Sequence, residues 1–140
     1  DLNKKRRNMR GAGTTTAMVA YAGFSPPLTS DTELWNGTNW TEVNNMNTAK
    51  YNMAGAGQSS TSALSAGGET SPDPTSALTE QWNGTNWTEV NDLNTGRFGV
   101  AGNGSVTSAL VFGGSLPGYT TATEEWTGAG AAVTKTITTS

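Results

Sequence analysis

The chain has 140 residues, of which 34% are hydrophobic, and its formal net charge at neutral pH is −3. It contains 18 glycines and five tryptophans but neither cysteine nor histidine. Disulfides are therefore excluded, and zinc sites, copper sites and a Ser-His-Asp triad are not expected. There is no run of about 18 apolar residues, so we expect no membrane-spanning helix.

The first ten residues hold most of the positive charge. Five of the eight basic residues lie there, namely Lys4, Lys5, Arg6, Arg7 and Arg10. A basic run can bind an anionic surface, but no aromatic residue is interleaved with this one to stack on nucleic-acid bases. We interpret the run as a solvated chain end or sheet edge and expect no nucleic-acid partner.

A block of sequence that starts at Trp35 returns almost unchanged from Trp82. It reads Trp-Asn-Gly-Thr-Asn-Trp-Thr-Glu-Val-Asn in both places. Each block is followed by Asn-Thr-(Ala/Gly)-(Lys/Arg)-aromatic and then by Ala-Gly-x-Gly, and a more diverged copy of these motifs lies upstream. Repeats of about 20–50 residues are typical of arrays such as solenoids and propellers. We expect residues 1–140 to form one segment of three repeats, at about 5–43, 49–90 and 97–138.

Each repeat is predicted to form four short strands, which are clearest in the middle copy. The expected strands are Tyr51–Gly57, Ser62–Ala66, Ala77–Trp82 and Trp87–Val90. The pair Gly67 and Gly68 ends the second strand, and a proline-containing loop leads to the third. Asn83-Gly84 is a strong hairpin signal, because both residue types tolerate positive φ. In the last copy, the alternating segment Val133–Thr138 is the expected fourth strand.

The chain as a whole is expected to be all-β. No segment has a clear apolar period of 3.6 residues, and turn signals recur every 8–12 residues. A four-stranded sheet of this composition must stack on similar sheets to bury its few large side chains. Radial stacking of such sheets gives a β-propeller, whose four-stranded sheets are called blades.

The spacing of glycines and tryptophans resembles the kelch pattern: a Gly-Gly pair after the second strand, an aromatic on the third and a Trp on the fourth. The matching sets are Gly67, Gly68, Trp82 and Trp87; Ala22, Gly23, Trp35 and Trp40; and Gly113, Gly114 and Trp126. The first copy lacks one glycine of this pattern. The last copy lacks the second tryptophan, since Ala131 stands in its place.

The amino-acid sequence of the repeat is similar to that of kelch-like repeats in virion proteins of tailed bacteriophages. That resemblance implies a virion or extracellular location and a structural, adhesive or decorating role without catalysis or cofactor. It also implies other virion proteins as partners, and a cell-surface glycan as a further one.

Three blades are too few to close a ring of the usual size, and an open arc would expose apolar blade faces. We expect the missing blades to come from elsewhere. Two copies of the chain would make a six-bladed ring as a homo-oligomer. Alternatively, further blades of a longer parent chain complete it.

The tryptophan pairs could stack on sugars, but their fixed place on the strands favours packing between blades. The Gly-x-Gly triplets lack the following helix of a phosphate-binding loop, and crowding near a propeller axis explains them better. The Asn-x-(Ser/Thr) sites are interpreted as turns. The sites are Asn36, Asn39, Asn83, Asn86 and Asn103.

Carboxylates recur at matching positions of the repeats. Glu33, Glu80 and Glu124 fall on the third strands, and Glu42 and Glu89 fall on the fourth. Glycoside hydrolysis needs two carboxylates at set separations. Their occurrence in successive repeats indicates a periodic outer face instead, so we expect no catalytic and no metal-binding residues.

Three loops of similar proline content but different sequence are the expected recognition elements, because variation on a constant scaffold is typical of binding surfaces. They span Ser25–Ser30, Glu69–Ser76 and Ser115–Thr121. Their candidate recognition residues are Pro26, Pro27, Pro72, Asp73, Pro74, Leu116, Pro117 and Tyr119.

Three classes of function remain to be separated. The first is a non-enzymatic phage virion protein, a capsid decoration or a tail or fibre module, acting as an interaction scaffold and in host attachment. The second is a secreted, lectin-like carbohydrate-binding adhesin. The third, an enzyme of the galactose-oxidase or sialidase type, lacks the His, Cys and Arg inventory that such sites need.

Overall fold

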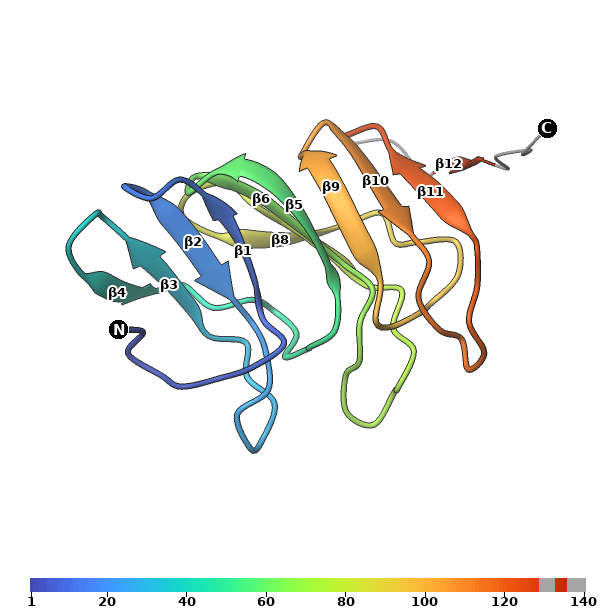
Figure 1. Cartoon of the computed structure of the whole chain (residues 1–140), viewed down its shortest axis with the longest axis horizontal. Coiled ribbons are helices and arrows are strands. Elements are labelled where there is room, and N and C mark those ends of the chain that lie inside the picture. The colour runs from blue at the N-terminus through green and yellow to red at the C-terminus, as the bar shows by residue number, and fades with distance from the viewer. Residues whose placement is uncertain (129–132, 136–140) are drawn as a thin grey trace.

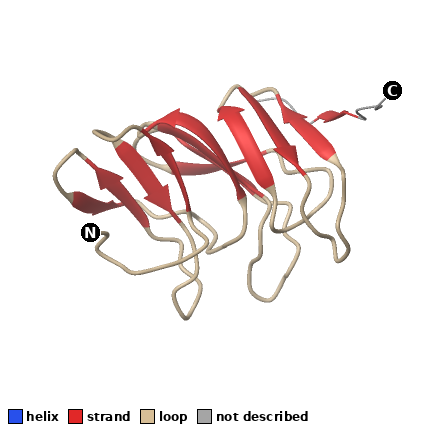
Figure 2. Ribbon diagram, viewed as in Figure 1, coloured by secondary structure: helices blue, strands red, loops and turns tan. Residues whose placement is uncertain are grey.

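The structure, a computed structural model, describes residues 1–128 and 133–135. These residues form twelve strands and no helix, arranged in three antiparallel sheets of four strands each (Figures 1 and 2). The predicted all-β class is confirmed.

Each sheet takes its strands in chain order, so neighbours in sequence pair in space. The first sheet consists of β1 (Arg10–Gly13), β2 (Met18–Tyr21), β3 (Thr32–Trp35) and β4 (Trp40–Val43). The second consists of β5 (Ala54–Ser59), β6 (Ser62–Ala66), β7 (Thr79–Trp82) and β8 (Trp87–Val90). The third consists of β9 (Ala101–Ser105), β10 (Ser108–Phe112), β11 (Thr123–Trp126) and β12 (Val133–Lys135).

Two strands of the middle repeat differ in their bounds from the sequence prediction: β7 begins at Thr79 instead of Ala77, and β5 is shifted at both ends, ending at Ser59 instead of Gly57. β5 begins at Ala54 instead of Tyr51, because Asn52 adopts a left-handed conformation (φ 54°) that interrupts the strand. Tyr51 instead forms an isolated bridge with Glu69. β12 covers Val133–Lys135, and the rest of the predicted fourth strand, residues 136–138, lies outside the described residues.

In the hairpin between β7 and β8, Asn83 and Gly84 stabilise the turn in different ways. Only the glycine uses positive φ, at 96°. The Asn83 side-chain oxygen accepts hydrogen bonds from the backbone N–H groups of Thr85 (2.9 Å) and Asn86 (2.8 Å). Asparagine thus stabilises the turn through its side chain, which mimics a backbone turn. The hairpin between β3 and β4 repeats this arrangement with Asn36.

The three sheets stand face to face in a row, with the first and third sheets at its two ends (Figure 1). β5 contacts β1 on one side and β9 on the other. Glycines permit this approach: a Cβ atom on Gly55 would lie 2.9 Å from the Tyr21 hydroxyl, and one on Gly102 would lie 2.9 Å from the Ala54 Cβ. The described residues do not close the row into a ring.

The core between the first two sheets is built around tryptophan. Trp82 and Trp87 of the second sheet are buried together with Val19 and Tyr21 of the first. The Tyr21 and Trp87 rings lie 4.8 Å apart. The Tyr21 hydroxyl donates to the Leu64 carbonyl oxygen at 3.0 Å. This hydrogen bond gives the buried Tyr21 hydroxyl a partner, so the contact between the two sheets is specific in register as well as apolar.

The core between the second and third sheets uses smaller side chains. One cluster contains Leu64 and Trp126, and the other contains Ala66, Val100 and Val111. The Trp126 indole N–H donates to the Val106 carbonyl oxygen at 2.9 Å. Trp35 and Trp82 make the same bond to the turn that joins the first two strands of their own sheets. The recurring tryptophan thus ties the third strand to that turn.

Candidate functional site

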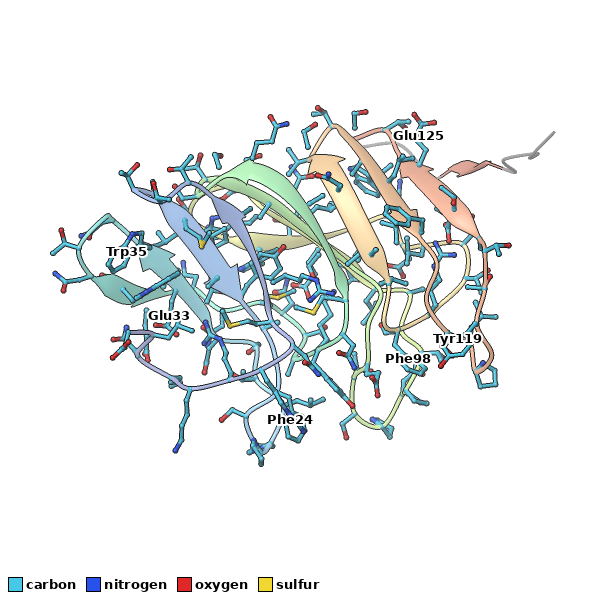
Figure 3. All side chains as sticks on the ribbon, viewed as in Figure 1. Phe24, Glu33, Trp35, Phe98, Tyr119 and Glu125 are labelled. Atoms are coloured by element: carbon cyan, nitrogen blue, oxygen red, sulfur yellow. The ribbon has the colours of Figure 1, made fainter. Side chains whose placement is uncertain are left out.

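The three loops that join the second and third strands of the sheets project from the same edge of the row (Figure 1). They contain the three segments expected to carry recognition. Two of their aromatic side chains, Phe24 and Tyr119, lie along this edge together with Phe98 (Figure 3). We refer to this side of the molecule, formed by residues 24–31, 69–76 and 115–121, as the loop edge.

The first loop is anchored by the residues that precede β1. Phe24 forms bridges with both Arg7 and Leu28. The Arg7 guanidinium lies 4.8 Å from the centre of the Phe24 ring, a cation–π contact. The Phe24 ring in turn lies 5.5 Å from that of Tyr51, which belongs to the second repeat. The first loop is therefore in contact with the segment that precedes the second sheet.

The second loop is held by Glu69. Its two carboxylate oxygens accept hydrogen bonds from the Tyr51 hydroxyl and from the Asn52 side-chain amide, both at 2.7 Å. The bond to Glu69 raises the pKa of Tyr51. Further along the loop, the Asp73 carboxylate accepts from the Thr75 backbone N–H at 3.0 Å. The loop is ordered by its own polar groups, and its prolines Pro72 and Pro74 are left exposed.

The third loop presents the most exposed aromatic side chain of the described residues. Ser115 forms bridges with Phe98 and with Tyr119, and its hydroxyl donates to the Pro117 carbonyl oxygen at 2.6 Å. Tyr119 is 100% exposed. A tyrosine held at a loop tip in full contact with solvent is suited to binding, because its ring offers area at a low cost in conformational entropy.

Two hollows open at the loop edge. One of about 440 Å³ separates the first and second loops and is lined by Pro27, Leu28, Asn47, Thr48, Ala49, Thr70 and Ser71. Another of about 380 Å³ lies beside the first loop and is lined by Lys5, Arg6, Arg7, Phe24, Ser25 and Pro26. Both combine backbone and hydroxyl groups with proline or aromatic surface, a mixture that suits a polar ligand with apolar faces.

The prediction that the third-strand carboxylates form an outer face is wrong. Glu33, Glu80 and Glu124 are no more than 2% exposed, whereas Glu42 and Glu89 on the fourth strands are exposed. Each buried carboxylate faces a buried basic residue that precedes the first strand of the same sheet. The three pairs are Arg6–Glu33 (3.0 Å), Lys50–Glu80 (3.8 Å) and Arg97–Glu124 (3.0 Å), as distances between a nitrogen and a carboxylate oxygen.

These carboxylates also hold the chain that enters each sheet. Glu33, Glu80 and Glu124 accept hydrogen bonds from the backbone N–H groups of Asn3, Asn47 and Asn94 at 2.7–2.8 Å. Burying a carboxylate is costly unless it is paired, and here both the cation and the amide groups supply partners. The recurring sequence Asn-x-x-(Arg/Lys) is thereby explained as an anchor beneath the loops.

The interpretation of the basic run as solvated is wrong for one of its members. The Arg6 side chain is fully buried against Glu33. Lys4 is half exposed and lies 2.9 Å from Asp31, which raises the pKa of Lys4. The sequence signal for this burial is the matching position of Arg6, Lys50 and Arg97 in the three repeats.

The tryptophans differ in burial according to the position of their sheet in the row. Trp82, Trp87 and Trp126 are buried between sheets. Trp35 and Trp40 belong to the sheet at one end and are only partly buried; Trp35 is labelled in Figure 3. The glycines Gly67, Gly68, Gly113 and Gly114 all have positive φ, and they turn the chain into the second and third loops. At the matching point of the first repeat, Ala22 adopts φ 57°.

Among the described residues no group of three or more Asp, Glu, His or Cys side chains is placed to hold a metal ion. No helix in that part of the chain has the length and apolar character needed to span a membrane. Comparison of the chain with models of protein families gave no match, and comparison with curated proteins gave none either.

Proposed function

We propose that this chain is a non-enzymatic interaction scaffold, a kelch-like propeller segment of a phage virion that binds through its loop edge. The observation that carries the proposal is the contrast between the three sheets with their buried ion pairs, which we call the frame, and the three loops of the loop edge. The frame repeats the same buried pairs and tryptophan bonds, whereas the three loops differ in sequence and meet at one edge. A repeated frame that displays variable loops is the usual form of a binding surface.

The burial of the recurring carboxylates supports a role without catalysis. A general acid or base must reach the substrate, and Glu33, Glu80 and Glu124 are closed off by their cations and by backbone amides. The virion location is proposed because the sequence of the repeat resembles that of kelch-like repeats in phage virion proteins. On this proposal the partners are other virion proteins and the surface of the host cell.

The experiment has two arms. Antibodies against the chain are used on purified virus particles and on particle-free lysate, and we expect the signal to follow the particles. In the second arm, Pro72, Asp73 and Pro74 are replaced together by Gly-Ser-Gly and binding to host cells is measured. We expect binding to fall at least tenfold with an unchanged melting temperature. Detection only in the particle-free lysate, or unchanged cell binding, would overturn the proposal.

A control replaces Ser60 and Thr61, in the tight turn between β5 and β6 at the opposite edge, with alanines. These residues are exposed or half-buried, and we expect cell binding to stay unchanged. A fall equal to that of the loop variant would show that general destabilisation, and not the loop edge, explains the loss.

A second function, a lectin-like adhesin, is favoured by one observation: Tyr119 is fully exposed at a loop tip, near Phe98. Aromatic faces stack on sugars, and the adjoining loops supply hydroxyl and backbone groups. A glycan array probed with the chain and with Tyr119→Ala separates this function from protein binding. Binding that is lost in the variant supports it, and an array without any bound glycan rejects it.

A further inference from the structure

Among the described residues, one face of the first sheet and one face of the third sheet are not covered by another sheet, and we call these the uncovered faces. On the third sheet, the uncovered face presents Leu110 and Phe112, which are 42% and 43% exposed. On the first sheet, it presents Trp35 and Trp40, both partly buried. Solvent-exposed apolar side chains in such positions mark an interaction surface, and the chain itself indicates which surface each face fits.

The uncovered face of the third sheet is the repeat equivalent of a face that is covered within the chain. β2 and β10 align so that Leu110 takes the place of Val19 and Phe112 takes the place of Tyr21. Val19 and Tyr21 are fully buried because the second sheet packs on them. The uncovered face of the first sheet is likewise the equivalent of the second-sheet face that does the covering.

Three contacts between the first two sheets define what each position requires. The Tyr21 ring packs at 4.8 Å from that of Trp87, and its hydroxyl reaches the strand glycine Gly55. The Trp87 indole N–H donates to the Thr32 hydroxyl at 3.0 Å. A Cβ atom on Gly55 would lie 3.0 Å from the Arg10 Cβ.

Equivalents of the aromatic ring, the glycine, the tryptophan and the threonine are present on the two uncovered faces, whereas the Tyr21 hydroxyl has no equivalent because residue 112 is phenylalanine. Phe112 corresponds to Tyr21, and Gly11 and Trp40 correspond to Gly55 and Trp87. Thr123 corresponds to Thr32 but is partly exposed, where Thr32 is fully buried. The Trp40 indole N–H has no hydrogen-bond partner among the described residues.

The side-chain sizes also match. Where the first sheet has Tyr21, the sheet that covers it has Trp87. Where the second sheet has the small Ala66, the sequence of the third repeat has Ala131 in place of the second tryptophan. At this position the third sheet has a large residue, Phe112, as the first sheet has Tyr21. The third sheet is therefore suited to pack against a sheet that carries the second tryptophan of the repeat. The first sheet is such a sheet.

We propose that the third sheet of one copy packs on the first sheet of a second copy, with Phe112 over Gly11 and against Trp40. The Thr123 hydroxyl then accepts the Trp40 N–H, as Thr32 accepts that of Trp87. Two such contacts close two copies into a ring of six sheets with two-fold symmetry. Glu125, at the position of Leu34, makes one part of the contact polar. The inference rests on the propeller part of the proposed function and not on its virion location.

The first test is the mass of the native chain, measured by analytical ultracentrifugation over a range of concentrations. We expect twice the 14.5 kDa mass of the chain. Phe112→Asp is expected to halve this mass with an unchanged far-ultraviolet circular dichroism spectrum, because Phe112 is already 43% exposed in the single chain. Tyr119→Asp, which alters an aromatic residue at the loop edge, is the matched control and is expected to keep the doubled mass.

The second test fixes the direction of the contact by disulfide formation, which is clean because the chain has no cysteine. Within the chain, the Cβ positions of Ala54 and Gly102 lie 2.9 Å apart, and their equivalents across the proposed contact are Ala101 and Gly11. Disulfides need Cβ atoms about 3.5–4.5 Å apart, which a small shift provides. We expect a mixture of Gly11→Cys and Ala101→Cys copies to give a linked pair on a non-reducing gel, and neither variant alone to do so.

A single-chain mass at all concentrations, or links that form equally in each variant alone, would overturn the inference. A closed assembly of any number of copies other than two would overturn it as well. None of these outcomes bears on binding at the loop edge, since the cell-binding arm is read separately. Failure of the ring and failure of the proposed function are thus distinguishable.

Discussion

Replacing the carboxylate of Glu80 with an amide probes the anchor beneath the loops. Glu80 Oε2 accepts from the Asn47 backbone and side-chain N–H groups at 2.8 and 3.0 Å. Its Oε1 accepts from the Thr48 backbone N–H at 3.2 Å and lies 3.8 Å from the Lys50 ammonium. In Glu80→Gln only one of the two positions keeps an acceptor oxygen, and the Lys50 charge loses its counter-ion.

The expected cost follows from the burial of both partners. Glu80 and Lys50 are 1% and 0% exposed, so water does not replace the lost partner. Removing one member of a buried ion pair typically costs about 3–5 kcal/mol. We expect the free energy of unfolding to fall by that amount in Glu80→Gln, a large share of the ~5–15 kcal/mol available to a folded domain.

The assay is urea unfolding followed by tryptophan fluorescence at one fixed chain concentration, with linear extrapolation to water. Glu89→Gln, on the exposed neighbour that pairs with Glu80 across the hairpin, is the control and should change the free energy by less than ~0.5 kcal/mol. Lys50→Met combined with Glu80→Gln removes both charges and should cost less than Glu80→Gln alone. A loss below ~1 kcal/mol in the single variant, or simple additivity in the double variant, would refute the anchor.

Two further predictions concern pH and backbone geometry. Burial lowers the pKa of Lys50 to about 8, against the opposing effects of Glu80, Asp92 and Glu89. The unfolded chain therefore holds the proton of Lys50 more tightly than the folded chain does. The free energy of unfolding, measured by urea titration, should rise by about 1–2 kcal/mol between pH 8 and 9.5. Lys50→Arg should abolish that rise, and a flat or falling wild-type profile would contradict the prediction. Gly57 has φ 130°, and a Cβ there would collide with the Ser62 carbonyl oxygen. Gly57→Ala should therefore strain the backbone by roughly 1–3 kcal/mol and lower the melting temperature. Gly118→Ala, where a Cβ would meet no atom within 4 Å, should leave the melting temperature unchanged, and equal melting temperatures of the two variants would contradict the prediction.

The strands and turns of this protein could be predicted from the sequence because their causes are local. The Asn83-Gly84 pair, the Gly67-Gly68 pair and the alternation of small and large residues act over a few positions. The middle strand Ser62–Ala66 was predicted with its observed bounds. The repeat of the tryptophan block at Trp35 extended the same assignment to the first sheet, and the Gly113-Gly114 pair with Trp126 extended it to the third.

The side-chain environments could not be predicted in this way, because they depend on segments far apart in the chain. Glu80 alternates with its neighbours like any surface residue of a strand, and only the packing of Asn47 and Lys50 against it makes the site buried. Trp35 and Trp82 have the same local sequence, yet one is partly exposed and the other is buried. The difference comes from the presence or absence of a sheet in front of each.

The sequence by itself therefore determined the class of the fold, the repeat and the position of the variable loops, since these follow from backbone conformation and short-range pattern. Tertiary structure decided which carboxylates are buried, that the three loops share one edge, and which sheet faces stay uncovered. The physical reason is that burial is a property of the stacked sheets, and identical residues acquire different environments when their neighbours in space differ.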